Sequence, residues 1–167
     1  PLVNAATHRY SVAGPTGALE VSIDDPVALP PHGIAVVCHP HPLHGGTMNN
    51  KVAQTLARAF VQLGYRAVRF NFRGVEGSAG RWDEGRGEVE DALAVVAAVR
   101  GPGQPLALAG FSFGAYVASQ AAARLLGTQA AERLVLVAPA TSNFEVAAVP
   151  AGTLVVHGEA DDVVPLS

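Results

Sequence analysis

The hydrophobic residues of the chain follow patterns that predict a layered fold of strands and helices. Five short segments are almost wholly apolar, and each has the length of a β-strand. A strand that is apolar on both faces is typical of a parallel sheet, because helices cover such a sheet on each side. The five segments are residues 34–38, 67–70, 106–109, 134–138 and 153–156.

The first part of the chain has a different, alternating pattern. Residues 8–12 and 18–24 are separated by a connection, residues 13–17, that contains glycine and proline. Within the second segment, Leu19, Val21 and Ile23 alternate with polar residues. This alternation predicts a β-hairpin with one face in the core and the other face in solvent.

Three longer segments with helical spacing lie between the apolar runs. They span residues 50–63, 87–100 and 113–126, and a glycine follows each of them, as is common where a helix ends. The alternation of strands and helices predicts an α/β fold with a doubly wound, mostly parallel sheet and an N-terminal antiparallel hairpin. Residues 1–167 are predicted to form one domain.

Composition and charge exclude several classes of protein. The chain is 49% hydrophobic and 15% charged, and its formal net charge is −3. It is too apolar for a disordered protein and not basic enough for a nucleic-acid binder. No apolar run reaches the ~18–20 residues of a membrane span, and the first residues do not resemble a secretory signal. The single cysteine, Cys38, cannot form an intramolecular disulfide, so a cytoplasmic location is expected.

One segment at the carboxyl end of a predicted strand carries a catalytic motif. Ligands bind at these strand ends in parallel α/β sheets. Residues 110–114, Gly-Phe-Ser-Phe-Gly, match the G-x-S-x-G nucleophile elbow and join a predicted strand to a predicted helix, as the motif requires. Ser112 is therefore the predicted nucleophile, and the N–H of Phe113 is a predicted oxyanion-hole donor.

The loop after residues 34–38 is expected to supply the second oxyanion-hole donor. Pro40 and Pro42 have no N–H, so the donor must come from His41, Leu43 or a later residue. We favour the backbone of His41, because the flanking prolines stiffen the loop and preorganise the site.

The histidines of the same loop also suggest a weaker alternative. The spacing of His39, His41 and His44 is similar to the metal-binding run of metallo-β-lactamase-like hydrolases, which would make the protein a metal-dependent hydrolase. However, Leu43 stands at the aspartate position of that run. No further cluster of His, Asp or Cys follows to complete a zinc site, so no metal is expected.

A carboxylate follows the last apolar segment. Asp161 lies just after residues 153–156 and is the predicted acid of a Ser-Asp-His triad, whose chain order in this fold is serine, acid, histidine. All six histidines precede Asp161. The triad histidine, with a further strand and helix, is therefore expected beyond Ser167, and the 167 residues alone are expected to be inactive.

Four runs of the sequence resemble the compact, lidless α/β-hydrolases that are similar to dienelactone hydrolase and to bacterial acyl-esterases and thioesterases. The runs are HPHPLHGGTMNNKV, RFNFRGVEGSAGRWDEGRGEVED, GFSFGAYVA and HGEADDVVP. The resemblance implies the α/β-hydrolase fold, Ser112 as nucleophile, Asp161 as acid and a histidine beyond Ser167. Glu76 stands where this family usually has a glycine, so either its backbone is strained or the loop shifts by one residue.

Several other residues are predicted to line the substrate pocket or to have structural roles. The connection between residues 139 and 152 is short, which predicts an open site with little or no lid. Arg73 is expected to be mainly a structural anchor, and the acidic residues near the start of segment 87–100 need no catalytic role. The predicted walls of the substrate pocket are Leu43, His44, Thr141, Ser142 and Asn143, with Trp82 as a weaker candidate.

The leading interpretation is a serine hydrolase of the EC 3.1 class that cleaves a small carboxylic ester or thioester through an acyl-serine intermediate. No cofactor, nucleic acid or membrane partner is expected, and a homodimer is compatible with the sequence. The alternative from another class is a catalytically silent α/β-hydrolase fold that binds ligands or proteins, because a triad histidine is absent from these residues.

Overall fold

The computed structural model describes residues 7–139, 150 and 152–157. These residues form a seven-stranded sheet in the order β1-β2-β4-β3-β5-β6-β7. The β1–β2 and β2–β4 pairs are antiparallel, and the remaining pairs are parallel. The strands are β1 (His8–Gly14), β2 (Gly17–Asp24), β3 (Ile34–Cys38), β4 (Arg66–Phe70), β5 (Leu106–Phe111), β6 (Arg133–Val137) and β7 (Leu154–Val156).

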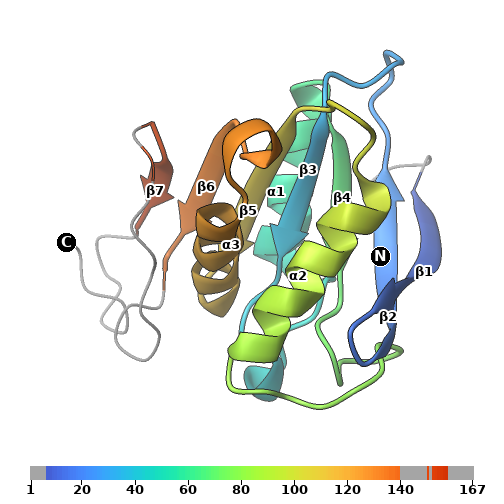
Figure 1. Cartoon of the computed structure of the whole chain (residues 1–167), viewed down its shortest axis with the longest axis vertical. Helices are drawn as coiled ribbons and strands as arrows, with labels where there is room; N and C mark the ends of the chain where they lie inside the picture. The colour runs from blue at the N-terminus through green and yellow to red at the C-terminus, as the bar shows by residue number, and fades with distance from the viewer. Residues whose placement is uncertain (1–6, 140–149, 151, 158–167) are drawn as a thin grey trace.

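In the part of the chain that the structure describes, three α-helices cover the two faces of the sheet. The helices α2 (Arg86–Val99) and α3 (Phe113–Arg124) lie on one face, and α1 (Lys51–Gln62) lies on the other (Figure 1). Two short 3-10 helices, Pro42–His44 and Gly127–Gln129, lie in the connections. Among the described residues, no helix is long and apolar enough to cross a membrane.

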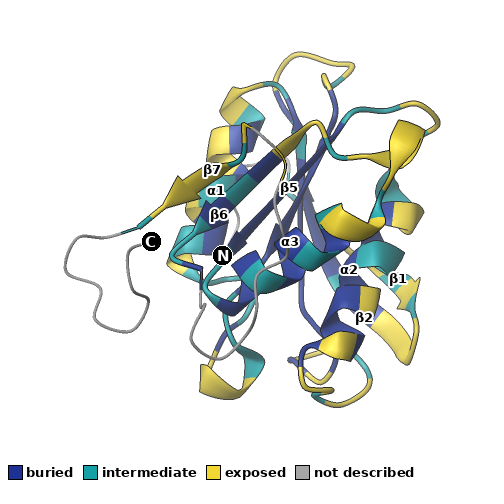
Figure 2. Cartoon of the chain, turned by 60° about the vertical axis from the view of Figure 1, so that its left-hand side comes forward, coloured by how far each residue is buried: buried dark blue, intermediate teal, exposed yellow. Residues whose placement is uncertain are grey.

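The sheet separates two hydrophobic clusters. On the side of α2 and α3, strand residues such as Val36, Phe70 and Leu108 belong to one cluster with residues of both helices. On the side of α1, the strands contribute mostly small residues, such as Ala35 and Ala67, which let α1 lie close to the sheet. The central strands are buried, whereas β1 and β7 at the two edges are exposed (Figure 2).

The predicted fold class and order of elements are confirmed. Each strand and helix predicted between residues 8 and 156 is present, and β3 has the predicted bounds. Helix α1 ends at Gln62, just before Gly64, where φ is 89°. Helix α3 ends at Arg124, earlier than predicted, and a 3-10 turn begins at Gly127. The hairpin and the doubly wound, mostly parallel sheet are therefore as expected.

The prediction of a solvent-facing side on the second hairpin strand is wrong for two residues. Ser22 and Asp24 are fully buried. Strand β2 is an inner strand, and the fully buried guanidinium of Arg69 on the neighbouring β4 lies against both side chains. Arg69 Nη2 lies 3.3 Å from Ser22 Oγ and 3.6 Å from Asp24 Oδ2. A buried cation needs oxygen partners, and these polar residues supply them.

Candidate active site

Ser112 lies at the junction between β5 and α3. Strand β5 ends at Phe111, and α3 begins at Phe113. Ser112 adopts φ 57° and ψ −118°, a backbone conformation that is rare for any residue other than glycine. Its N–H donates to the carbonyl of Val137 over 2.9 Å, and its own carbonyl accepts from Ala115 N over 2.9 Å. The strained serine is thus held by β6 on one side and by the first turn of α3 on the other.

Two glycines make the sharp turn at Ser112 sterically allowed. A Cβ on Gly110 would collide with the backbone of Gly114, and a Cβ on Gly114 would collide with the carbonyl oxygens of Cys38 and His39. These contacts bring β3, β5 and α3 closer than any side chain permits. The two glycines of the G-x-S-x-G motif are therefore required by the close approach of these elements.

The loop that follows β3 is tightly bonded within itself. The carbonyl of His41 accepts the N–H groups of His44 and Gly46, each over 3.0 Å. His41 Nδ1 accepts the N–H of Leu43 over 3.1 Å, which fixes Nε2 as the protonated nitrogen of a neutral ring. Because these later N–H groups donate within the loop, they are poor candidates for an oxyanion donor.

His39 is a structural residue of this loop. Its side chain is fully buried. The N–H of Phe72 donates to His39 Nε2 over 3.1 Å, so Nδ1 carries the proton and donates to the carbonyl of Pro40 over 2.7 Å. Burial lowers the pKa of His39 to about 4, with the bond to Pro40 opposing the shift. Both ring nitrogens are engaged with backbone groups, which does not fit a metal ligand.

The remaining observations on this loop also do not favour the metallohydrolase alternative. Among the residues that the structure describes, no group of three or more His, Cys, Asp or Glu side chains could hold a metal ion. The rings of His41 and His44 are stacked, with centroids 4.3 Å apart and an angle of 19° between their planes. The pKa of His41 is lowered first by partial burial and then by the neighbouring His44.

Three aromatic rings meet beside Ser112. The ring of His41 lies 4.6 Å from that of Trp82 and 5.2 Å from that of Phe113. The rings of Trp82 and Phe113 are themselves 5.2 Å apart. These three residues come from the loop after β3, the loop before α2, and the first turn of α3. The structure therefore brings together three segments that are far apart in the sequence.

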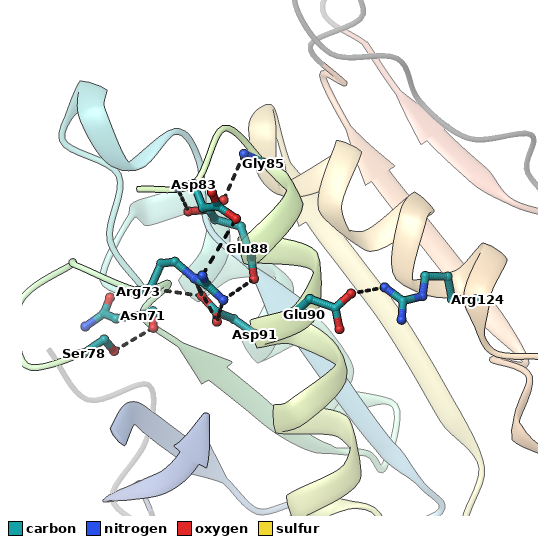
Figure 3. A network of polar contacts seen from close by, with 10 residues as sticks. Asn71, Arg73, Ser78, Asp83, Gly85, Glu88, Glu90, Asp91 and Arg124 are labelled. Atoms are coloured by element: carbon teal, nitrogen blue, oxygen red, sulfur yellow. Dashed lines mark hydrogen bonds and ion pairs between the residues drawn. The ribbon is translucent and has the colours of Figure 1, made fainter. Parts of the chain in front are cut away.

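The loop that carries Trp82 is anchored by a buried ion pair (Figure 3). The guanidinium of Arg73 bonds both carboxylate oxygens of Asp91, with Nη2 at 2.7 Å from Oδ1 and Nε at 3.0 Å from Oδ2. Its Nη2 also donates to the carbonyl of Gly87 over 2.8 Å. The hydrogen bonds to Asp91 raise the pKa of Arg73. The interpretation of Arg73 as a structural anchor is confirmed, and Asp91 is its partner.

Glu88, in the first turn of α2, fixes the end of the same loop. Its two carboxylate oxygens accept the N–H groups of Asp83 and Gly85, each over 2.9 Å (Figure 3). Burial raises the pKa of Glu88, and these backbone bonds oppose that shift.

Within the loop, Glu76 adopts a φ of 46°, so the strained backbone anticipated at that position is present.

The structure describes only some of the predicted site residues. Ser112, Phe113 and His41 are brought together at the carboxyl end of the sheet. Leu43 and His44 are exposed in the short 3-10 helix beside them. The other predicted site residues, Asp161, Thr141, Ser142 and Asn143, lie outside the described residues.

Sequence reasoning underestimated Trp82 and did not find Arg69. Trp82 is the only tryptophan among the 167 residues, and its half-buried ring lies against the ring of His41 in the loop after β3. Arg69 interrupts an otherwise apolar strand segment. A charged residue inside such a segment indicates that a buried polar partner lies nearby, here Ser22 and Asp24.

A doubly wound sheet with a strained serine between β5 and α3 defines an α/β serine hydrolase. Residues 31–150 match the family Hydrolase_4, described as "Serine aminopeptidase, S33". The chain belongs to this family, within the α/β-hydrolase superfamily.

Solved structures support the same superfamily. The chain is similar to XC6422 of Xanthomonas campestris, an α/β serine hydrolase without a lid, with 42% identity and a TM-score of 0.85 over 98% of this chain and 76% of that one. A serine hydrolase homologue from Coxiella burnetii is 43% identical, with a TM-score of 0.83 over 95% and 76% of the two chains.

A curated relative is also similar to this chain. The uncharacterized protein RP471 of Rickettsia prowazekii is 44% identical over 110 residues. The match covers 64% of this chain and 46% of that protein, so the chain spans less than half of the relative's length.

Proposed function

We propose that the protein cleaves a small carboxylic ester or thioester through an acyl-enzyme intermediate on Ser112. The observation that carries the proposal is the Ser112 backbone, at φ 57° and ψ −118° between a strand and a helix. A non-glycine residue persists in such a conformation only where its surroundings enforce it, and this strain is concentrated at functional sites. Membership of a serine hydrolase family supports the same class of reaction.

The first step is nucleophilic attack by Ser112 Oγ on the acyl carbon. The C–O bond forms as the hydroxyl proton moves to a general base, and the carbonyl π electrons move to the oxygen. The tetrahedral intermediate then collapses and expels the alcohol or thiol, which takes up the proton. Water repeats the sequence on the acyl-enzyme and releases the acid.

Backbone N–H groups of Phe113 and His41 are proposed to stabilise the oxyanion. Phe113 is the first residue of α3, where N–H groups have no acceptor within the helix and the helix dipole is positive. In the loop after β3, the N–H groups of Leu43, His44 and Gly46 donate to His41. Those bonds support His41 as the loop residue that faces the oxyanion.

The rest of the triad is proposed on the resemblance and on chain order. Asp161 would orient a histidine that follows it in the chain, and that histidine would act as the general base. The proposed walls of the pocket near the leaving group are Leu43 and His44. Both are exposed on the same loop as His41, as expected for residues that contact a substrate. Thr141, Ser142 and Asn143 are proposed to form a further wall of the pocket.

A catalytically silent binding protein is the less favoured function. Such a protein has no need for a strained serine, and relaxing that backbone would recover of order 1–3 kcal/mol. Retention of the strain together with the two close-packed glycines supports a working nucleophile.

A fluorophosphonate probe tests the proposal on the full-length protein. We expect the probe to label one site, found by mass spectrometry on the peptide that contains Ser112, and we expect Ser112→Ala to abolish labelling. The matched control is Ser11→Ala, which removes an exposed hydroxyl on the edge strand β1 and leaves labelling unchanged. Equal labelling of the wild type and Ser112→Ala would refute the proposal.

A panel of substrates separates the bond types. The panel holds a p-nitrophenyl ester, an acyl thioester and an aminoacyl p-nitroanilide, because the family description names a serine aminopeptidase. Our proposal expects the ester or thioester to be turned over faster than the anilide. Faster turnover of the anilide would contradict it.

A further inference from the structure

Trp82 joins the two segments that carry the proposed oxyanion-hole donors. Its half-buried indole ring lies 4.6 Å from the ring of His41 and 5.2 Å from the ring of Phe113, with interplanar angles of 35° and 56°. The rings of His41 and Phe113 are also in contact, at 5.2 Å. The three rings thus form a closed triangle in which each member restrains the other two.

The position of Trp82 is fixed from the side of α2. Asp83 and Gly85, which follow Trp82 in the chain, donate their N–H groups to the carboxylate of Glu88 over 2.9 Å (Figure 3). The other end of the loop is held by the buried Arg73–Asp91 pair, with an Nη2–Oδ1 distance of 2.7 Å. A helix therefore anchors the loop close to Trp82, and the indole transmits this restraint to the site.

The ring of Phe113 is held more rigidly than the ring of His41. It is fully buried, and it also lies 5.6 Å from the ring of Phe72 and 5.8 Å from that of Tyr116. His41, by contrast, lies in a loop and is only partly buried. Loss of the indole would therefore leave Phe113 in place and release mainly the His41 segment.

We infer that Trp82 is a positioning residue that holds the backbone of His41 at the correct distance from the backbone of Phe113. The inference rests on the proposed function, in which the two N–H groups share one oxyanion. Donors act at about 2.7–3.1 Å from the oxyanion, and a displacement of about 1 Å can reduce the rate on the order of 100-fold. The indole itself does not need to touch the reacting atoms.

A positioning role and a role as a pocket wall predict different kinetics. Displacement of an oxyanion donor weakens an interaction made in the transition state, so kcat falls while KM changes little. Loss of a binding wall weakens substrate and transition state equally, so KM rises while kcat is retained. The two roles of Trp82 can therefore be distinguished in one experiment.

The experiment compares full-length wild type, Trp82→Ala and Trp82→Phe with p-nitrophenyl acetate as the substrate. We expect Trp82→Ala to lower kcat by about 10–100-fold with KM within about 3-fold. We expect Trp82→Phe to recover most of kcat, because a phenyl ring can still pack between His41 and Phe113. The control is Tyr10→Ala, which removes a half-exposed aromatic ring from the edge strand β1 and leaves kcat unchanged.

Each outcome decides the inference. An unchanged kcat in Trp82→Ala, or a raised KM with kcat retained, overturns it. If thermal denaturation shows that Trp82→Ala does not fold, Trp82→Leu replaces it and is held to the same criteria against Trp82→Phe. A wild type that neither turns over esters nor reacts with the fluorophosphonate probe refutes the proposed function itself, which is a different result from an active wild type with an insensitive Trp82.

Discussion

The N–H of Phe72 donates a 3.1 Å hydrogen bond to Nε2 of the buried His39. This bond connects the end of β4 to the loop that follows β3. It holds the imidazole in its neutral form, since protonation of Nε2 would place two donors against each other. Protonation of His39 would therefore cost both this bond and the desolvation of a charge.

A loss of stability in acid follows from the state of His39. Its pKa is lowered from 6.5 to about 4 in the folded protein. Because the unfolded chain binds the proton more readily, the contribution of neutral His39 is fully present above pH 6.5 and is lost as the pH falls towards 4. Urea denaturation between pH 7 and pH 4 should show a decrease of about 3 kcal/mol from this group.

The same series in His39→Ala isolates that contribution. The variant is less stable at pH 7 because it leaves the Phe72 N–H unsatisfied, but its stability should fall less steeply over the acid range. A pH dependence identical to that of the wild type would show that His39 does not titrate as the structure requires.

The close approach at Gly114 predicts a large steric effect. Gly114→Ala would place a Cβ against the carbonyls of Cys38 and His39. Both are backbone groups, so they cannot move away by a change of side-chain rotamer. We expect a loss of about 3 kcal/mol or more, or failure to fold. The matched control is Gly101→Ala, whose Cβ would meet only Gln104 Oε1 at 3.6 Å and which should be tolerated. Equal stability of the two variants in chemical denaturation would contradict this packing.

Two ion pairs on α2 provide a comparison of buried and exposed charges (Figure 3). Asp91→Asn breaks the buried pair with Arg73, and we expect a loss of about 3–5 kcal/mol because a buried cation remains. Glu90→Gln breaks the exposed pair with Arg124, and we expect a loss of less than about 1 kcal/mol. Denaturant titration of both variants checks the contrast, and similar losses would mean that Arg73 is not buried in solution.

Most of the fold could be predicted from local pattern. Residues 34–38 are apolar throughout and form the strand predicted there, and the segment after Asn50 forms the predicted helix. The spatial order of the strands was not contained in the pattern, and so the burial of Ser22 and Asp24 could not be foreseen. Both are buried because β2 pairs with β4 and its Arg69, a contact between segments about 45 residues apart in the chain.

In the site, too, the features set by local sequence could be predicted, and the contacts between distant segments could not. Ser112 and its flanking glycines form a local motif, whose geometry follows from the junction of a strand with a helix. The partners of His39 and Trp82 come from other strands and loops. Such contacts depend on how the strands are ordered, and sequence reasoning therefore left both residues with uncertain roles.

The most direct test of the central claim is to trap the acyl group on Ser112. The full-length protein is mixed with a slowly hydrolysed p-nitrophenyl ester, quenched in acid, digested and analysed by mass spectrometry. Our account predicts one acyl group on the peptide that contains Ser112, an initial burst of p-nitrophenol, and a loss of at least about 1,000-fold in kcat for Ser112→Ala. Turnover without an acylated peptide, and with Ser112→Ala as active as the wild type, would contradict it.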